Sequence, residues 1–131
     1  MGNQMAIHES AEDYLEKILI LNERMGQVRS IDIANEMNYS KPSISVAMKK
    51  LRENGYIGVD RNGFITLKPA GREIAERIYA RHRLLTEVLT GLGVSEETAS
   101  EEACRIEHDI SDDTCSRIGR FYEQHRGCYD T

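Results

Sequence analysis

The sequence SKPSISVAMKKLRENGYIGVDRNGFITL occupies residues 40–67 and contains a change of hydrophobic period. From Ile44 to Leu51, apolar residues recur every three or four positions, as in a helix with one buried face. Two short β-prone runs follow, residues 56–60 and 64–67, and Asn62-Gly63 between them supplies the positive φ angles of a tight hairpin. This segment therefore predicts a helix followed by a two-stranded ribbon.

Helical periodicity continues on both sides of this segment. Before it, residues 8–25 form an amphipathic pattern, and Ser30 can cap a short helix that ends at a turn in residues 38–40. After it, a long helix is expected from residue 70 to about residue 92. Two further helices are expected to start near Ser95 and Ser111.

The order of these elements predicts the fold class. We expect a mainly α protein, with an N-terminal winged helix-turn-helix over residues 1–70 and a C-terminal helical domain over residues 71–131. The low content of glycine (10) and proline (2) in 131 residues agrees with a largely helical chain.

The composition excludes several classes of protein. With 40% hydrophobic and 30% charged residues, the chain has a globular rather than a fibrous or disordered composition. No run approaches the roughly 18 apolar residues of a membrane helix, and the first ten residues lack the pattern of a secretion signal. Three cysteines without regular spacing argue against a disulfide framework. We therefore expect a cytoplasmic protein without a membrane partner.

The charge is distributed unevenly along the chain. The net charge is −5, but residues 41–72 contain seven basic and two acidic residues, a balance of +5 that leaves −10 for the rest. A basic segment in an acidic protein is a candidate contact for phosphate, although such a run can also be an ordinary solvated helix face. Because it coincides with the expected helix-turn-helix, we expect binding to double-stranded DNA.

The second helix of a helix-turn-helix enters the major groove with its N-terminal residues toward the base edges, and nearby basic residues hold phosphates. On this pattern the expected DNA-binding residues are Ser40, Lys41, Pro42, Ser43, Val46, Lys49, Lys50 and Arg61.

A second group of residues has the chemistry of a metal site. Cys104, Glu107 and His108 stand at positions i, i+3 and i+4 of an expected helix, so a thiolate, a carboxylate and an imidazole share one face. Asp13 and Glu16 offer two carboxylates at i and i+3 of the first helix. Each has an ordinary alternative, because helical cysteines are often small core residues and helical carboxylates are often solvated.

His82 lies on the apolar side of the long helix, where a hydrogen-bonded core histidine is the ordinary alternative. Spacing alone does not bring three helices together, but five motifs point to a known family. They are AEDYLEKI (11–18), the helix-turn-helix with residues 40–51, LKPAG (67–71), ARHRLL (80–85) and IEH (106–108). On these motifs the chain resembles the short, manganese-responsive branch of the DtxR/MntR family of metal-dependent repressors.

The resemblance implies a repressor of metal-uptake genes that binds a palindromic operator as a homodimer. Residues 1–70 would then bind DNA, and residues 71–131 would bind metal and form the dimer. The implied metal ligands, which lie between these two halves, are Asp13, Glu16, His82, Glu107 and His108.

The chain also departs from the manganese branch. Cys104 stands where that branch usually has glutamate and the iron branch has cysteine, whereas Asp13 stands where the iron branch has methionine. Carboxylates suit Mn²⁺ and a thiolate favours softer ions, so we expect Mn²⁺ or Fe²⁺, with Mn²⁺ slightly favoured and one or two ions per subunit. Thr86 and Ser100 replace ancillary ligands of the iron branch, and Val46 replaces a polar residue that often reads bases.

Metal binding is expected to act as a switch, because it would neutralise clustered carboxylates and tie the first helix to the C-terminal helices. One alternative is a metal-independent winged-helix regulator whose C-terminal helices only dimerise. A hydrolase is the other, but the sequence has no clear pair of nucleophile and base, so we expect neither catalysis nor a small organic substrate. Cys115 is expected in the core, and Cys128 is expected to be an incidental thiol.

Overall fold

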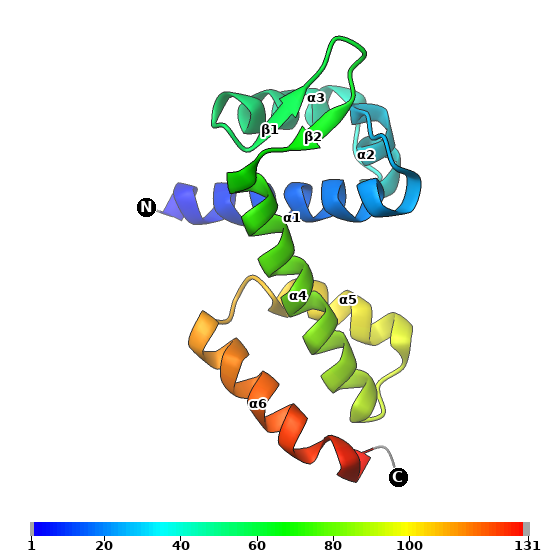
Figure 1. The fold of residues 1–131 in the computed structure, drawn as a ribbon, viewed down its shortest axis with the longest axis vertical. Helices are drawn as coiled ribbons and strands as arrows, with labels where there is room; N and C mark the ends of the chain where they lie inside the picture. The colour runs from blue at the N-terminus through cyan, green and yellow to red at the C-terminus, as the bar shows by residue number, and fades with distance from the viewer. Residues whose placement is uncertain (1, 130–131) are drawn as a thin grey trace. The chain divides into compact units, whose positions relative to one another are not determined.

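The computed structural model describes the backbone of residues 2–129 and the side chains of residues 10–125. This part of the chain forms six helices and a two-stranded ribbon (Figure 1), so the mainly α fold class is confirmed. The elements are α1 (Gly2–Met25), α2 (Ser30–Met37), α3 (Lys41–Glu53), β1 (Ile57–Val59), β2 (Ile65–Leu67), α4 (Pro69–Gly91), α5 (Glu96–Ile106) and α6 (Asp112–Tyr129).

The chain forms two compact units, Met1–Arg77 (unit 1) and Ile78–Thr131 (unit 2). The boundary between them falls within α4. The expected functional boundary after residue 70 concerns DNA and metal binding, and it stays a prediction. None of the helices in the described residues is long and apolar enough to span a bilayer.

Unit 1 is a winged helix-turn-helix with an aliphatic core. Helix α1 contacts α2 and β2, while α3 contacts α2 and β1. Its fully buried side chains include Leu15, Ile18, Val28, Ile33, Ile44, Ile57 and Ile65. The turn between α2 and α3 requires a left-handed residue, which is Asn38 at φ 59°, and Ser40 caps α3 by accepting a hydrogen bond from the Ser43 N–H (3.3 Å).

The cap of α2 differs from the expected one by a residue. Ser30 is the first residue of the helix, and the N-cap position belongs to Arg29. The Arg29 N–H donates to the Asp32 carboxylate at 2.9 Å. An acidic side chain three positions into the helix therefore does the capping, without a hydroxyl at the N-cap position.

The hairpin is antiparallel, with Gly58 paired to Thr66, and its turn differs from the predicted one in the backbone conformation of Asn62. Gly63 has φ +84°, but Asn62 does not have a positive φ. The Asp60 carboxylate instead accepts from the N–H groups of Asn62 (2.8 Å) and Phe64 (3.0 Å). The Asp60 N–H also donates to the Phe64 carbonyl (3.0 Å), so residues 61–63 form the loop between the two predicted runs, with one left-handed glycine instead of two residues at positive φ.

The hairpin returns to the helices through a close backbone approach at Gly71. The Tyr56 carbonyl accepts a hydrogen bond from the Lys68 N–H at 2.9 Å. A Cβ atom on Gly71 would lie 2.1 Å from that same carbonyl oxygen, well inside van der Waals contact. The LKPAG motif therefore ends in glycine because only a residue without a side chain fits there.

Unit 2 contains the rest of α4 with α5 and α6. Ser95 caps α5 and Ser111 caps α6, as expected; their hydroxyls accept from the N–H groups of Thr98 (3.3 Å) and Thr114 (3.0 Å). The buried positions of α5 are small, because Ala99 and Ala103 are both fully buried. Cys115 on α6 is half-buried, and the side chain of Cys128 lies outside the described residues.

Candidate functional site

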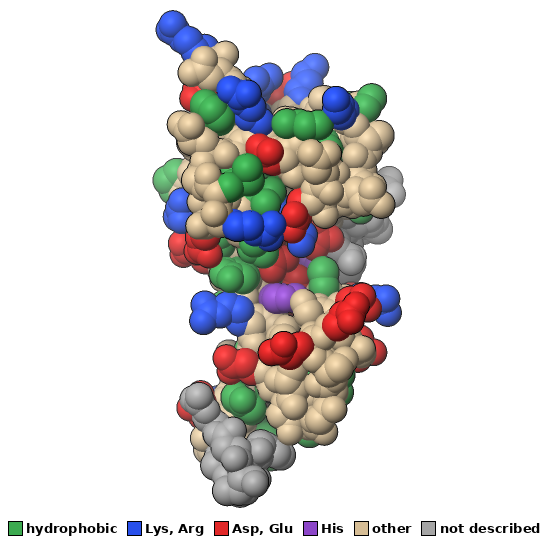
Figure 2. All heavy atoms as spheres, turned by 90° about the vertical axis from the view of Figure 1, so that its right-hand side faces the viewer, with side chains coloured by type: hydrophobic (Ala, Val, Ile, Leu, Met, Phe, Trp, Pro, Cys, Tyr) green, Lys and Arg blue, Asp and Glu red, His purple; other side chains and the backbone are tan. Residues whose placement is uncertain are grey.

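The first candidate site is the exposed face of α3 with the hairpin loop. Ile44, Met48 and Leu51 are buried, so the opposite face of α3 points outward. All eight expected DNA-binding side chains are exposed; they are Ser40, Lys41, Pro42, Ser43, Val46, Lys49, Lys50 and Arg61. We call these eight residues the α3 surface. Lys and Arg side chains gather at the end of unit 1 that carries the hairpin (Figure 2).

Sequence reasoning missed two residues beside the α3 surface. The guanidinium of Arg29 lies 4.4 Å from the centroid of the Phe64 ring, which adds a cation next to the hairpin loop. Tyr39, in the turn before α3, is half exposed and makes an edge contact with Tyr14 on α1. Burial, together with Tyr39 and Asp13, raises the pKa of Tyr14, so its phenol stays protonated at neutral pH.

The second candidate site brings together, in unit 2, residues from α4, from α5 and from the turn that follows α5. The Glu107 side chain is fully buried, and its Oε2 atom lies 3.0 Å from His82 Nδ1. Its Oε1 atom lies 3.6 Å from His108 Nε2. The Cys104 Sγ atom and a Glu107 carboxylate oxygen lie within 4.8 Å of each other. We call His82, Cys104, Glu107 and His108 the unit 2 cluster.

The chemistry of the unit 2 cluster fits a divalent ion. A buried carboxylate is costly unless charges or hydrogen bonds compensate it, and Glu107 Oε1 has no hydrogen-bond partner among the described residues. Imidazole, carboxylate and thiolate are the donors that first-row divalent metals take in proteins. Ser100 lies 3.3 Å from His82 Nε2, so this hydroxyl is near the histidine that the sequence singled out.

Arg81 is a further residue of this region that sequence reasoning missed. Its side chain is 11% exposed. Nη1 donates to the carbonyls of Glu107 and Ile110, both at 2.9 Å, and Nη2 contacts the Asp112 carboxylate. Arg81 therefore contacts the main-chain carbonyl of Glu107, while the adjacent His82 contacts the carboxylate of the same residue. An arginine beside a candidate histidine ligand was the only available signal.

The remaining expected ligands lie on α1 in unit 1. Asp13 is half-buried, and Glu16 is 3% exposed. Both stand at the expected spacing within a continuous helix, so their carboxylates leave α1 on one side. That they share an ion with the unit 2 cluster stays a prediction.

Comparison with known proteins places these features in a family. Residues 6–63 match the iron dependent repressor N-terminal DNA binding domain, and residues 68–130 match the iron dependent repressor metal binding and dimerisation domain. The chain belongs to the iron-dependent repressor (DtxR/MntR) family. The resemblance inferred from its motifs is thereby confirmed.

Individual relatives agree with the family match. The chain is 37% identical to the HTH-type transcriptional regulator MntR of Geobacillus kaustophilus over 110 residues, which cover 84% of this chain and 78% of that protein. The manganese regulator SloR is 31% identical with a TM-score of 0.75, covering 86% of this chain and 53% of that one. A manganese-dependent transcriptional repressor in complex with manganese is 33% identical with a TM-score of 0.76, covering 82% and 50%. This chain thus spans about half the length of these two solved structures.

Proposed function

We propose that this protein is a metal-responsive transcriptional repressor that binds a palindromic operator as a homodimer and controls metal-uptake genes. It would act in the cytoplasm, without catalysis and without an organic substrate. The observation that carries the proposal is the fully buried Glu107 carboxylate between two imidazoles, in a chain whose α3 surface is exposed and basic.

The α3 surface is proposed to meet DNA. Ser40, Lys41 and Ser43 lie at the N-terminal end of α3, the end that reads base edges in helix-turn-helix proteins. Lys49 and Lys50, two turns further along, are exposed and suited to phosphate oxygens, and Arg61 in the hairpin loop extends the basic surface. The match of residues 6–63 to a DNA-binding domain supports this assignment.

The proposed metal ligands are the unit 2 cluster together with the two carboxylates of α1, namely Asp13, Glu16, His82, Cys104, Glu107 and His108. Mn²⁺ is slightly favoured over Fe²⁺, because three of these groups are carboxylates, whereas the Cys104 thiolate favours the softer ion. Relatives named for manganese regulation support the same order. One or two ions per subunit would satisfy this set.

The coupling between metal and DNA is proposed to arise from charge. A divalent ion supplies positive charge that compensates the carboxylates when it is bound. Without that compensation Asp13, Glu16 and Glu107 repel one another, which favours separation of α1 from α4 and α5. When the ion compensates these charges, the spacing of the two α3 helices of a dimer becomes fixed. Both helices can then enter major grooves that lie one helical turn of DNA, roughly 34 Å, or a multiple of that distance apart. This is a population shift that does not require metal to touch DNA.

The experiment measures the affinity for the protein's own upstream DNA, anaerobically, with Mn²⁺, Fe²⁺, Zn²⁺ or a chelator. We expect roughly 5- to 150-fold tighter binding with the physiological ion, the usual range of allosteric coupling. Glu107→Ala should abolish this gain while the protein stays folded and dimeric. Glu101→Ala, which removes an exposed carboxylate of α5, is the matched control and should keep the gain.

Equal affinity in chelator and in excess metal would refute the metal response and favour the metal-independent regulator. The family match to a metal-binding domain over residues 68–130 argues against that alternative. Calorimetry gives a second measurement, because a protein without a metal site would release no heat with any of the three ions.

A further inference from the structure

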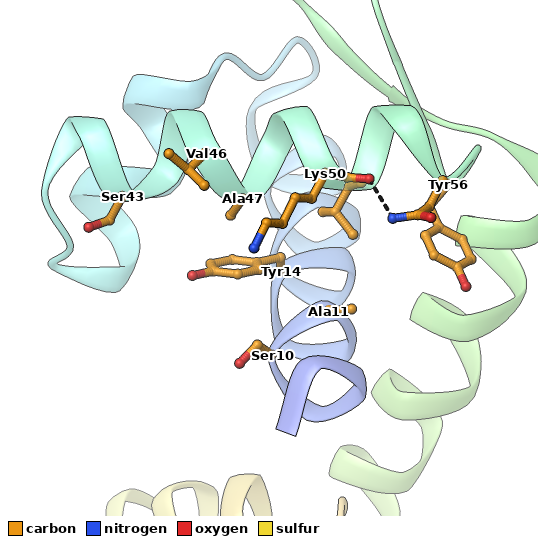
Figure 3. A pocket seen from close by; sticks show the side chains of 10 residues that line it. Ser10, Ala11, Tyr14, Ser43, Val46, Ala47, Lys50 and Tyr56 are labelled. Atoms are coloured by element: carbon orange, nitrogen blue, oxygen red, sulfur yellow. Dashed lines mark hydrogen bonds between the residues drawn. The ribbon is translucent and has the colours of Figure 1, made fainter. Parts of the chain in front are cut away.

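The α3 surface borders a hollow of about 530 Å³ within unit 1 (Figure 3). In Figure 3, Ser43, Val46, Ala47 and Lys50 extend from α3 toward the hollow, and Tyr14 lies opposite them on α1. Ala11, Tyr14, Val46, Ala47 and Leu51 give its wall a largely apolar character, whereas the polar side chains of Ser10, Ser43, Lys50, Asn54 and Tyr56 lie around them.

Val46 is the feature that needs an explanation. Its side chain is 56% exposed, although Val28 in the same unit is fully buried. It stands between Ser43 and Lys50 at helical spacing, so a hydroxyl, an aliphatic group and a cation follow one another along one edge of α3. Val46 continues the apolar wall that Tyr14, Ala47 and Leu51 form, and a contiguous apolar surface with a polar rim, unlike a single exposed apolar side chain, often marks a contact with a partner.

We propose that Val46 is a specificity-determining residue that reads the 5-methyl group of a thymine in each half-site, with Ala47 and the Tyr14 ring behind it. The inference rests on the proposed function and adds a base preference to it. The major groove presents mostly hydrogen-bonding atoms, and the thymine methyl is its one apolar group. A valine cannot donate or accept a hydrogen bond, so it discriminates by covering that methyl and by leaving the amino group of cytosine unpaired.

Charge supports DNA rather than a small apolar ligand as the occupant. Lys50 is part of the rim, and Lys49 is exposed on the next position of the helix. Ser43 offers a hydroxyl on the other side of Val46. Cations and hydroxyls around an apolar centre match a nucleotide, which presents a phosphate beside an apolar methyl.

The test begins with selection of duplexes from DNA with a randomised centre, using the full-length protein in Mn²⁺ and, separately, in Fe²⁺. Each thymine of the enriched duplex is then replaced by deoxyuridine, which removes the methyl and keeps every hydrogen-bonding group. We expect one thymine per half-site at which this replacement weakens binding about fourfold, the value of one buried methyl-sized group. In Val46→Ala the same replacement should change Kd by less than about 1.5-fold, because the methyl has lost its partner.

Ser45→Ala is the matched control. Ser45 is exposed beside Val46 but does not line the hollow, so this variant should keep the fourfold sensitivity at the same thymine. Because Val46 is exposed, we expect Val46→Ala to unfold at the wild-type temperature. A second measurement replaces that thymine by 5-iododeoxyuridine, whose photo-cross-link should map to the peptide containing Val46 or to the one containing Tyr14.

Two results separate the inference from the proposed function. If Val46→Ala leaves every thymine as sensitive as in the wild type while metal-dependent binding persists, the inference is wrong and the proposed function stands. A cross-link that maps elsewhere leads to the same conclusion. If neither Mn²⁺ nor Fe²⁺ enriches any duplex, the proposed function fails and the inference falls with it.

Discussion

The α3 surface and the unit 2 cluster place their polar groups in opposite environments. Every residue of the α3 surface is exposed, whereas Glu107 in the unit 2 cluster is fully buried and His82 and His108 are partly or almost entirely covered. Exposed charges are screened by water and salt, so they suit attraction to a polyanion. Buried charges act strongly over short distances, so they suit selection of a single ion. The two regions should therefore respond differently to mutation, salt and pH.

The largest effect is expected where the stability of unit 1 depends on a close backbone contact that involves no charged group. Gly71→Ala should destabilise the protein by about 3 kcal/mol, because its Cβ would lie 2.1 Å from the Tyr56 carbonyl oxygen. Gly119→Ala is the control in unit 2, since its Cβ would meet Leu84 at an ordinary 3.5 Å and alanine favours the helix. Denaturant unfolding measures both variants, and equal stability of the two would contradict the close approach.

The next effect concerns the buried side of the comparison. Arg81→Met should lower the stability of the metal-free protein by about 2 kcal/mol, because the Glu107 and Ile110 carbonyls lose a charged donor. Loss of the same contacts should weaken metal affinity roughly tenfold. Arg83→Met, an exposed neighbour on α4, is the control. Metal affinity is measured by calorimetry, and an unchanged value in Arg81→Met would show that Glu107 keeps its position without this arginine.

A smaller effect is expected on the exposed side. Lys49→Ala should weaken DNA binding about fivefold and lower the slope of log affinity against log salt by about 1, because one phosphate contact is lost. Arg105→Ala removes an exposed cation from α5 in unit 2 and should leave the slope unchanged. Titrations at several salt concentrations distinguish the two, and equal slopes would remove Lys49 from the DNA contacts.

The smallest effect is expected at a surface ion pair in unit 1. The Arg24 guanidinium contacts the Glu36 carboxylate at 3.1 and 3.2 Å, and this hydrogen bonding lowers the pKa of Glu36 below its usual value. The stability that this ion pair adds to the folded protein is therefore fully present at pH values above the usual pKa of a glutamate. It is lost as the pH falls through the lowered pKa of Glu36 in the folded state. A double-mutant cycle with Arg24→Met and Glu36→Gln should give a small but measurable favourable coupling at neutral pH, because water and salt screen an exposed ion pair. A coupling that survives at pH 2 or in high salt would contradict an electrostatic origin.

The sequence predicted most of unit 1 because local signals determine it. The apolar spacing of α3 gives its buried face, and exposure of the eight DNA-binding candidates follows from the same periodicity. The errors there were also local. Arg29, not Ser30, occupies the N-cap position, because the Asp32 carboxylate accepts from the Arg29 N–H. Asn62 does not have the predicted positive φ, because the Asp60 carboxylate organises the loop by accepting from the N–H groups of Asn62 and Phe64.

The unit 2 cluster was predictable only in part. Spacing predicts that Cys104, Glu107 and His108 share one helical face, although α5 ends at Ile106 and Glu107 is its C-cap. No local rule brings His82 to Glu107, since they are 25 positions apart. Family motifs supplied that association. Neither the spacing nor the family motifs predicted the role of Arg81, because it donates to main-chain carbonyls, which no side-chain pattern reveals.

The sequence by itself thus determined the helix periods, the capping hydroxyls and the basic segment, because each depends on residues within a turn or two of the chain. The burial of Glu107, the close approach at Gly71 and the hollow beside Val46 were decided by tertiary packing. These features join groups that are distant along the chain, and only the folded backbone fixes the distances and the exclusion of water on which their chemistry depends.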